Sequence, residues 1–196
     1  MTYETTAGPV RLRHFTLADC EIADATPPTP EDDRFSWFGF PVPGRLRAMV
    51  ESGGFPGPGD ISGRLAVEVD GEYAGTVSWH PKDYGPIQAP ALSFGIGLLP
   101  TARGKGYGTQ AQRLLVAYLF ATTTVNRVEA GTDVENIAEQ RSLEKAGLLR
   151  EGVVHGAHYR EGKYNDMVLY GITRPDFERA RAAKGTKVTT GFTASR

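Results

Sequence analysis

A glycine-rich turn between a strand-like and a helix-like segment constrains the fold of this chain most. Residues 91–98 are typical of a strand, which Gly95 and Gly97 interrupt, and the run Arg103-Gly104-Lys105-Gly106-Tyr107-Gly108 follows. After this run, apolar positions 107, 111, 114, 115 and 118 indicate one face of a helix. Glycines at alternate positions expose backbone N–H groups, and the N-terminus of the following helix adds a positive dipole. The order predicts a turn that binds phosphate oxygens.

Two well-known phosphate-binding motifs do not fit this turn. A dinucleotide fingerprint starting at Gly104 needs its third glycine where the chain has Thr109, and no acidic residue closes the following strand. A P-loop built on Gly104 and Lys105 needs a glycine where Leu99 stands and a Ser or Thr where Gly106 stands. Two interpretations stay open: a pyrophosphate loop of the acyl-coenzyme A type, and a simple turn before a helix without a ligand.

The rest of the chain alternates helices and strands, which is typical of a mixed α/β or α+β sheet. Thr16 with Asp19 resembles a capping box, Asp70-Gly71 predicts a tight hairpin turn, and Gly147 predicts a left-handed helix cap. The expected strands are 10–14, 65–69, 73–79, 91–98, 127–131, 149–159 and 167–172, and the expected helices are 16–25, 45–51, 136–146, one starting at 107 and one beyond 176.

These motifs resemble the GNAT superfamily of N-acetyltransferases. The run Arg103–Gly108 matches the Arg/Gln-x-x-Gly-x-Gly/Ala signature of that superfamily. Asn136 and the segment Leu143-Glu144-Lys145-Ala146-Gly147-Leu148 follow at the expected distance, before Arg150-Glu151-Gly152 and a closing strand at 166–170. This order looks like the ribosomal-protein alanine N-acetyltransferase (RimJ/RimL-like) branch, and the resemblance covers about residues 10–176.

The resemblance implies a mixed, mostly antiparallel sheet of about seven strands flanked by helices, with one central strand splaying from its neighbour to admit the pantetheine arm. Acetyl-CoA is the implied cosubstrate, and no metal is implied. The implied cofactor-binding residues are Gly95, Ile96, Gly97 and Leu98 for the pantetheine amides, Arg103, Gly104, Lys105, Gly106, Tyr107, Gly108 and Thr109 for the pyrophosphate region, and Asn136 near the sulfur. The residues agree independently, because Gly95 and Gly97 allow another extended chain to approach closely.

The chemistry of the reaction suggests which groups to look for. Amide formation from a thioester needs a neutral amine, donors for the developing oxygen charge, and a proton for the departing thiolate. Backbone groups at 96–98 can act as the donors. Relatives often place a base Glu where this chain has Ser93, and an acid Tyr or Ser where it has Leu143 and Glu139. The remaining acid and base candidates are Glu129, Glu139, Ser142 and Tyr159.

Several residues have a structural interpretation beside the functional one. Asn136, with Glu139 three residues later, also resembles a helix N-cap with a capping box. His155 and His158 lie three residues apart on an expected strand, so they should point to opposite faces and not share a metal. The acidic residues Glu31, Asp32 and Asp33 beside Trp37–Phe40 suggest either an enclosure for a cationic amine or a solvated loop.

Composition excludes some classes of partner. The 22 Lys and Arg nearly balance the 23 Asp and Glu, for a net charge of -1, so neither nucleic acid nor an anionic membrane is an expected partner. The longest apolar run, 114–121, is far shorter than the roughly 20 residues of a membrane span. Cys20 is the single cysteine, which fits a reducing cytoplasm.

We therefore expect a cytoplasmic acyl-CoA-dependent N-acyltransferase. Its domain should cover residues 1–183, and the polar tail 184–196 should be disordered. The acceptor would be a primary amine of a small molecule or a protein N-terminus, and the enzyme a monomer or homodimer. The alternative is a catalytically weak acyl-CoA-binding or regulatory module on the same fold.

Overall fold

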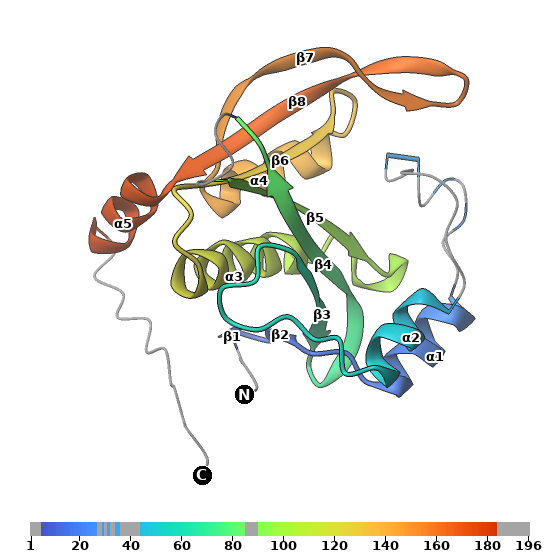
Figure 1. The fold of residues 1–196 in the computed structure, drawn as a ribbon. Helices are drawn as coiled ribbons and strands as arrows, with labels where there is room; N and C mark the ends of the chain where they lie inside the picture. Colours follow the sequence, from blue (N-terminus) through green and yellow to red (C-terminus); the bar gives the residue numbers. More distant parts are fainter. Residues whose placement is uncertain are drawn as a thin grey trace.

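A single mixed sheet organises the chain (Figure 1). The structure, a computed structural model, describes residues 5–26, 29, 31, 34–35, 44–84 and 90–183. Within these residues the sheet has eight strands in the order β1-β2-β3-β4-β5-β6-β8-β7, compared with the expected seven or so. The additional strand is the short β1, which pairs antiparallel with β2.

The strands are β1 Thr5–Ala7, β2 Val10–Arg13, β3 Gly63–Val69, β4 Glu72–Lys82, β5 Ala91–Leu98, β6 Arg127–Asp133, β7 Leu149–Arg160 and β8 Lys163–Thr173. The helices are α1 Leu17–Ala25, α2 Arg45–Glu51, α3 Tyr107–Thr122, α4 Ile137–Ala146 and α5 Arg174–Ala183, with a 3₁₀ turn at Pro100–Ala102. The last helix starts two residues earlier than Asp176, the position from which the sequence predicts it.

Local sequence signals explain several of these boundaries. Thr16 and Asp19 form the expected capping box at the start of α1. The β3–β4 turn places Asp70 and Gly71 at φ 52° and 89°, the left-handed backbone that a tight hairpin requires. Gly147 ends α4 at φ 105°, as a left-handed cap does. These three predictions are confirmed.

Two apolar layers cover opposite faces of the sheet. Leu65 and Val67 of β3 belong to the main core, which the buried face of α3 completes with residues such as Leu115 and Leu119. Ala66, between them, faces the other way and belongs to a second cluster beside α1 and α2. Alternation along β3 therefore places α3 on one face of the sheet and the α1–α2 pair on the other (Figure 1).

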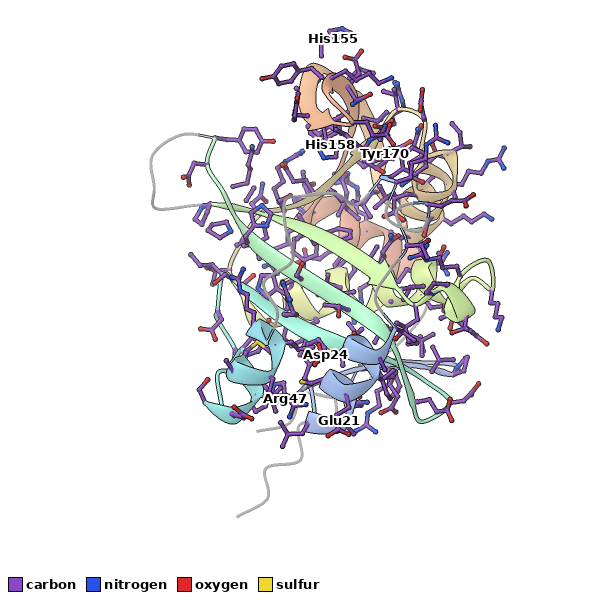
Figure 2. All side chains as sticks on the ribbon, turned by 90° about the vertical axis from the view of Figure 1, so that its right-hand side faces the viewer. Glu21, Asp24, Arg47, His155, His158 and Tyr170 are labelled. Carbon is purple, nitrogen blue, oxygen red and sulfur yellow. The ribbon has the colours of Figure 1, made fainter. Side chains whose placement is uncertain are left out.

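The long β7–β8 hairpin extends from the end of the sheet opposite β1 (Figure 1). Its turn uses Glu161 and Gly162 at φ 53° and 78°. His155 and His158 both lie on this hairpin (Figure 2), but the pairing register shifts between Val154 and His158, so simple alternation does not describe them. His155 Nδ1 lies 2.8 Å from Asp166 Oδ2 at the surface.

Two features of the sequence analysis lie wholly or partly outside the described residues. Asp32, Asp33 and residues 36–40 are not described, and neither is the expected tail at 184–196. Among the described residues, no helix combines the length and apolar character needed to cross a lipid bilayer.

Candidate active site

The sheet opens between β5 and β6. These strands run parallel and pair at only two positions, Leu92 with Val128 and Ser93 with Glu129. Beyond Ser93, β5 continues to Leu98 and β6 to Asp133 without further pairing between them. The strands therefore splay, and the edge of β5 that faces β6 is left with backbone groups that an extended ligand can meet.

A glycine on the neighbouring strand β4 leaves the space that the end of β5 occupies. Gly75 of β4 pairs with Leu98, and its φ of 151° lies in the range that favours glycine. A Cβ atom at Gly75 would collide with the carbonyl oxygen of Gly97. Gly75 was not expected from the sequence, although a glycine inside a strand pattern was the available signal.

The glycine-rich turn lies at the carboxyl end of β5 and begins α3. Gly104 and Gly106 have φ of 74° and 82°, and Gly106 is the N-cap residue without a side-chain cap. The first backbone bond of the helix runs from the Gln110 N–H to the Gly106 carbonyl, 3.2 Å away. The amides of the first turn therefore have no acceptor within the helix and can bind an anion.

Contacts around Arg103 and Gly108 join this turn to its neighbours. Arg103 Nε donates to the Leu98 carbonyl oxygen over 2.9 Å and thereby ties the turn to the end of β5. A Cβ atom built on Gly108 would lie 3.6 Å from Leu98 Cδ1 and 3.8 Å from Ser142 Oγ. The end of β5, the start of α3 and the middle of α4 thus meet at one point.

A partly buried chain of polar side chains connects α3 to α4 behind this point. The Thr109 and Ser142 hydroxyl oxygens lie 3.0 Å apart, and Ser142 Oγ donates to Gln112 Oε1 over 3.0 Å. Gln112, which is fully buried, donates through Nε2 to Glu139 Oε1 over 2.6 Å. Burial raises the pKa of Glu139 to about 7, although the Gln112 bond acts in the opposite direction. This carboxyl group can therefore hold a proton near neutral pH.

Gln112 was missed from the sequence. It stands three and seven residues before Leu115 and Leu119, so helical spacing puts it on their buried face. A glutamine on an apolar face needs buried partners for its amide, and that requirement was the available signal. Two of the four candidate acid and base residues, Glu139 and Ser142, belong to this set of hydrogen-bonded side chains between α3 and α4.

Asn136 is the N-cap of α4. Its Oδ1 accepts from the Glu139 N–H over 3.2 Å, as one half of a capping box. The expected reciprocal bond from the Asn136 N–H goes instead to the Asp133 carbonyl oxygen, 3.0 Å away. The Glu139 carboxyl group bonds Gln112, so the full capping box is a wrong prediction. The cap uses Oδ1, and the amide nitrogen of Asn136 is not part of it.

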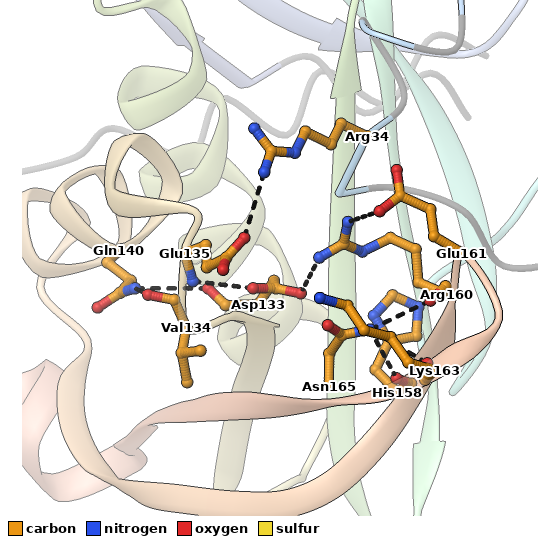
Figure 3. A network of polar contacts seen from close by, with 10 residues as sticks. All are labelled: Arg34, Asp133, Val134, Glu135, Gln140, His158, Arg160, Glu161, Lys163 and Asn165. Atoms are coloured by element: carbon orange, nitrogen blue, oxygen red, sulfur yellow. Dashed lines mark hydrogen bonds and ion pairs between the residues drawn. The ribbon is translucent and has the colours of Figure 1, made fainter.

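A network of ion pairs and hydrogen bonds joins the end of β6 to the β7–β8 hairpin (Figure 3). Arg160 Nη2 lies 2.7 Å from Asp133 Oδ2, and both side chains are buried. Asp133 Oδ1 also accepts from the Glu135 N–H over 2.8 Å. Burial acts to raise the pKa of Asp133, but the Glu135 N–H and Arg160 outweigh it and the net pKa is lowered. The hairpin residue Arg160 thus fixes the end of β6, and with it the start of α4.

The other two candidates, Glu129 and Tyr159, have different surroundings. The buried Glu129 carboxylate accepts hydrogen bonds from the Tyr84 hydroxyl, which lies 2.9 and 2.7 Å from its two oxygens. It also accepts one from Arg127 Nε over 2.8 Å. Tyr159 is half exposed near the tip of the hairpin, where it packs on Tyr164 with ring centroids 5.2 Å apart. Neither residue touches the polar chain between α3 and α4.

A cavity of about 560 Å³ lies on the α1–α2 side of the sheet. It is lined by residues of α2, of the segment after it, of β3 and of β4, and the sequence analysis did not foresee it. The lining residues are Arg45, Leu46, Met49, Gly54, Phe55, Pro56, Asp60, Ser62, Gly63, Arg64, Ser78, Trp79 and His80. Ser78 pairs with Gly95 of β5, so the cavity borders the splayed strand.

Among the described residues, no three His, Cys, Asp or Glu side chains are grouped so that they could hold a metal ion. Glu31 is exposed, and the rest of the acidic and aromatic segment proposed for the amine lies outside the described residues. Cys20 is buried, and burial raises the pKa of its thiol. It is therefore not an activated nucleophile.

Comparisons with known proteins agree with this architecture. The family described as the acetyltransferase (GNAT) domain matches residues 10–149. Over 110 residues the chain is 34% identical to the probable N-acetyltransferase YjcK of Bacillus subtilis, covering 56% of this chain and 60% of YjcK. Over 109 residues it is 30% identical to the putative ribosomal N-acetyltransferase YdaF of the same organism, covering 56% and 58%. The chain thus matches less than two thirds of the length of these relatives.

Solved structures share the fold. Mycobacterium smegmatis RimJ in complex with CoA-disulfide superposes with a TM-score of 0.68 at 19% identity, covering 94% of this chain and 93% of RimJ. Spermidine N-acetyltransferase from Vibrio cholerae, in complex with CoA and spermine, has a TM-score of 0.70 at 17% identity, covering 87% and 98%. The chain belongs to the GNAT acetyltransferase family, as its motifs predict, and the similarity to YdaF supports the RimJ/RimL-like branch.

Proposed function

We propose that this protein is an acyl-CoA-dependent N-acyltransferase that moves an acetyl group from acetyl-CoA to a primary amine. The observation that carries the proposal is the opening of β5 from β6 after Ser93, next to a glycine turn with free helix amides. This arrangement fits both ends of coenzyme A, since splayed backbone can meet the amides of pantetheine and the turn can meet its pyrophosphate.

The residues available at the groove fit this cosubstrate. Gly95 to Leu98 would present backbone groups to the pantetheine arm, and Arg103 to Thr109 would surround the pyrophosphate. A Cβ at Gly104 or Gly106 would meet no atom within 4 Å, so the space beside both glycines is open. Asn136 would donate from its amide nitrogen near the sulfur end of the arm.

Acetyl-CoA would supply an acetyl thioester, whose sulfur must gain a proton as it departs. Glu139 is the candidate acid with the most suitable environment, because burial raises its pKa to about 7. Ser142, linked to Glu139 through Gln112, connects that carboxyl group with Thr109 at the start of α3. Glu129 and Tyr159 are proposed only as helpers.

The acceptor is proposed to be a small-molecule amine or a protein N-terminus. The names of YdaF and of the spermidine enzyme represent both classes. The catalytic domain would cover residues 1–183, with residues 184–196 as a tail. We further propose that the protein is cytoplasmic and that it is a monomer or a homodimer.

A screen of primary amines with acetyl-CoA, detecting the released thiol, tests the activity. An enzyme should release thiol with at least one acceptor and in proportion to amine concentration. Release that never exceeds the acceptor-free background, in a protein that binds coenzyme A, would favour the alternative of a catalytically weak binding or regulatory module.

A further inference from the structure

The geometry points to an acceptor that carries a carboxylate close to its reactive amine, bound by Arg64 and Arg45 in the cavity beside β4. This inference rests on the proposed function and narrows its substrate class. It depends on three observations: where the cavity lies, what charges line it, and which of those charges have partners.

The first observation is a row of paired residues across three strands. Arg64 of β3 pairs with Ser78 of β4, and Ser78 pairs with Gly95 of β5. Directly paired residues of antiparallel strands point to the same face, and a Cβ on Gly95 would lie 3.9 Å from Ser78 Oγ. The cavity lined by Arg64 and Ser78 therefore borders, on one face of the sheet, the strand proposed to hold the pantetheine arm.

The row also sets a distance. Neighbouring strands are about 4.8 Å apart, so the backbones of Arg64 and Gly95 are separated by about 10 Å. An extended peptide advances about 3.5 Å per residue. A carboxylate on one of the first three residues of a peptide, or a few bonds from the amine of a small molecule, is thus within reach of the arginine.

The second observation is the excess of positive charge around the cavity. Two guanidinium groups, from Arg45 and Arg64, line it together with one carboxylate, from Asp60, and the imidazole of His80. Asp60 Oδ2 already accepts from the Gly57 N–H over 2.7 Å. Burial, and then the charge of Arg45, lowers the pKa of Arg64, as expected for two cations close together. A bound anion would relieve this repulsion.

The third observation is that these two arginines lack partners. On the same face of the sheet, Arg13 forms ion pairs with Asp19, at 2.5 Å, and with Glu68. Among the described residues, the guanidinium groups of Arg45 and Arg64 have no hydrogen-bond or ion-pair partner. Arg64 is half-buried and Arg45 is exposed, so the cost of a cation without a counterion falls mainly on Arg64. A guanidinium group binds a carboxylate strongly through two parallel hydrogen bonds.

The same charges argue against polyamines as preferred acceptors. A polyamine would bring further ammonium groups close to the two guanidinium groups, which is unfavourable. An aminocarboxylate instead brings a negative charge, which the two guanidinium groups attract. Its two sources, a small amino acid and the acidic N-terminus of a protein, share this chemistry.

The test compares two acidic acceptors with their amide counterparts, and both pairs with spermidine. The peptide amides Ala-Asp-Glu-Ala and Ala-Asn-Gln-Ala, the small pair 4-aminobutanoate and 4-aminobutanamide, and spermidine are offered with acetyl-CoA, and thiol release gives kcat/KM for each. Binding of the acidic peptide to the CoA-loaded protein is measured separately by calorimetry. At least one acidic member should exceed its amide partner about tenfold, a typical value for a charge-assisted contact, and the pair in which it does so identifies the source.

Variants assign the preference to these arginines. Arg64→Gln should reduce the tenfold preference to less than about twofold and weaken peptide binding in parallel, while Arg64→Lys retains part of both. Arg45→Gln should act in the same direction and also serves if Arg64→Gln fails to fold. Arg47→Gln, on the same helix (Figure 2) but outside the cavity lining, is the matched control and should leave the preference unchanged.

The outcomes separate the two proposals. Equal rates for acids and amides, a preference for spermidine, or a preference unaffected by both variants would overturn this inference and leave the acyltransferase proposal intact. Binding of the acidic peptide that needs Arg64, without transfer to any amine, would support the anion site and contradict the proposed activity.

Discussion

Ser93 and Glu129 form the last paired position between the parallel strands β5 and β6. After this pair, the two strands diverge while each remains bonded to its other neighbour, β4 for β5 and β8 for β6. Backbone groups in a sheet are normally paired, so an interior strand that stops pairing indicates a place for another extended chain. The candidate groove is defined by this divergence and by the glycine turn at its end.

The first prediction concerns the glycine turn. Gly106→Val should weaken coenzyme A binding more than Lys105→Ala does, because Gly106 has a φ of 82° and its open side faces the space proposed for the pyrophosphate. Lys105 is exposed and contributes a charge that salt screens. Calorimetry with coenzyme A measures both affinities. Equal losses, or a larger loss for Lys105→Ala, would indicate a site that depends on charge.

The second prediction separates the two roles of Asn136. Asn136→Ala removes the N-cap bond to the Glu139 N–H and should lower the free energy of unfolding by about 1 kcal/mol. If the amide nitrogen also contacts the pantetheine arm, the same change should weaken coenzyme A binding by about 1–3 kcal/mol. Chemical denaturation and calorimetry give the two numbers. Unchanged affinity with a lower stability would leave capping as its whole role.

The third prediction concerns the pH dependence of stability. Burial raises the pKa of Glu139 from 4.5 to about 7, so between these values the folded protein binds more protons than the unfolded chain. The contribution of Glu139 to stability is therefore present at low pH and is lost as pH rises to about 7. Glu139→Gln keeps a neutral side chain, and it should be more stable than the wild type at pH 8 by up to about 3 kcal/mol.

Urea denaturation at pH 5 and pH 8 measures this difference, which should be small at pH 5. Glu178→Gln, at an exposed position of α5, is the control and should show no pH-dependent gain. If the difference in unfolding free energy between Glu139→Gln and wild type does not change with pH, the pKa of the Glu139 carboxyl group is not raised.

Local elements were predictable because their signals lie within a few residues. Thr16 with Asp19, Asp70 with Gly71, and Gly147 each specify a backbone conformation that the structure contains. The three-residue strand β1 was missed because so short a segment has no periodicity to read. The divergence of β5 from β6 was predicted only through the family resemblance, because no local sequence pattern indicates where two strands stop pairing.

The chemistry of the site was less predictable for the same reason. Gln112 and Glu139 stand 27 positions apart, and only the packing of α3 on α4 brings them together. That contact also explains the failed half of the capping box, because the Glu139 carboxyl group turns to Gln112 and away from the Asn136 N–H. The row from Arg64 through Ser78 to Gly95 depends on strand register, which residue spacing alone did not reveal.

The central claim is that the groove between β5 and β6 binds acetyl-CoA, and thermal unfolding with and without ligand tests it most directly. A ligand that binds only the folded protein, at about a hundredfold above its dissociation constant, stabilises it by about 2.7 kcal/mol. We predict a clear rise of the unfolding temperature with millimolar acetyl-CoA, little change with NADH, and a smaller rise for Gly106→Val. An unfolding temperature that acetyl-CoA leaves unchanged and NADH raises would contradict the account.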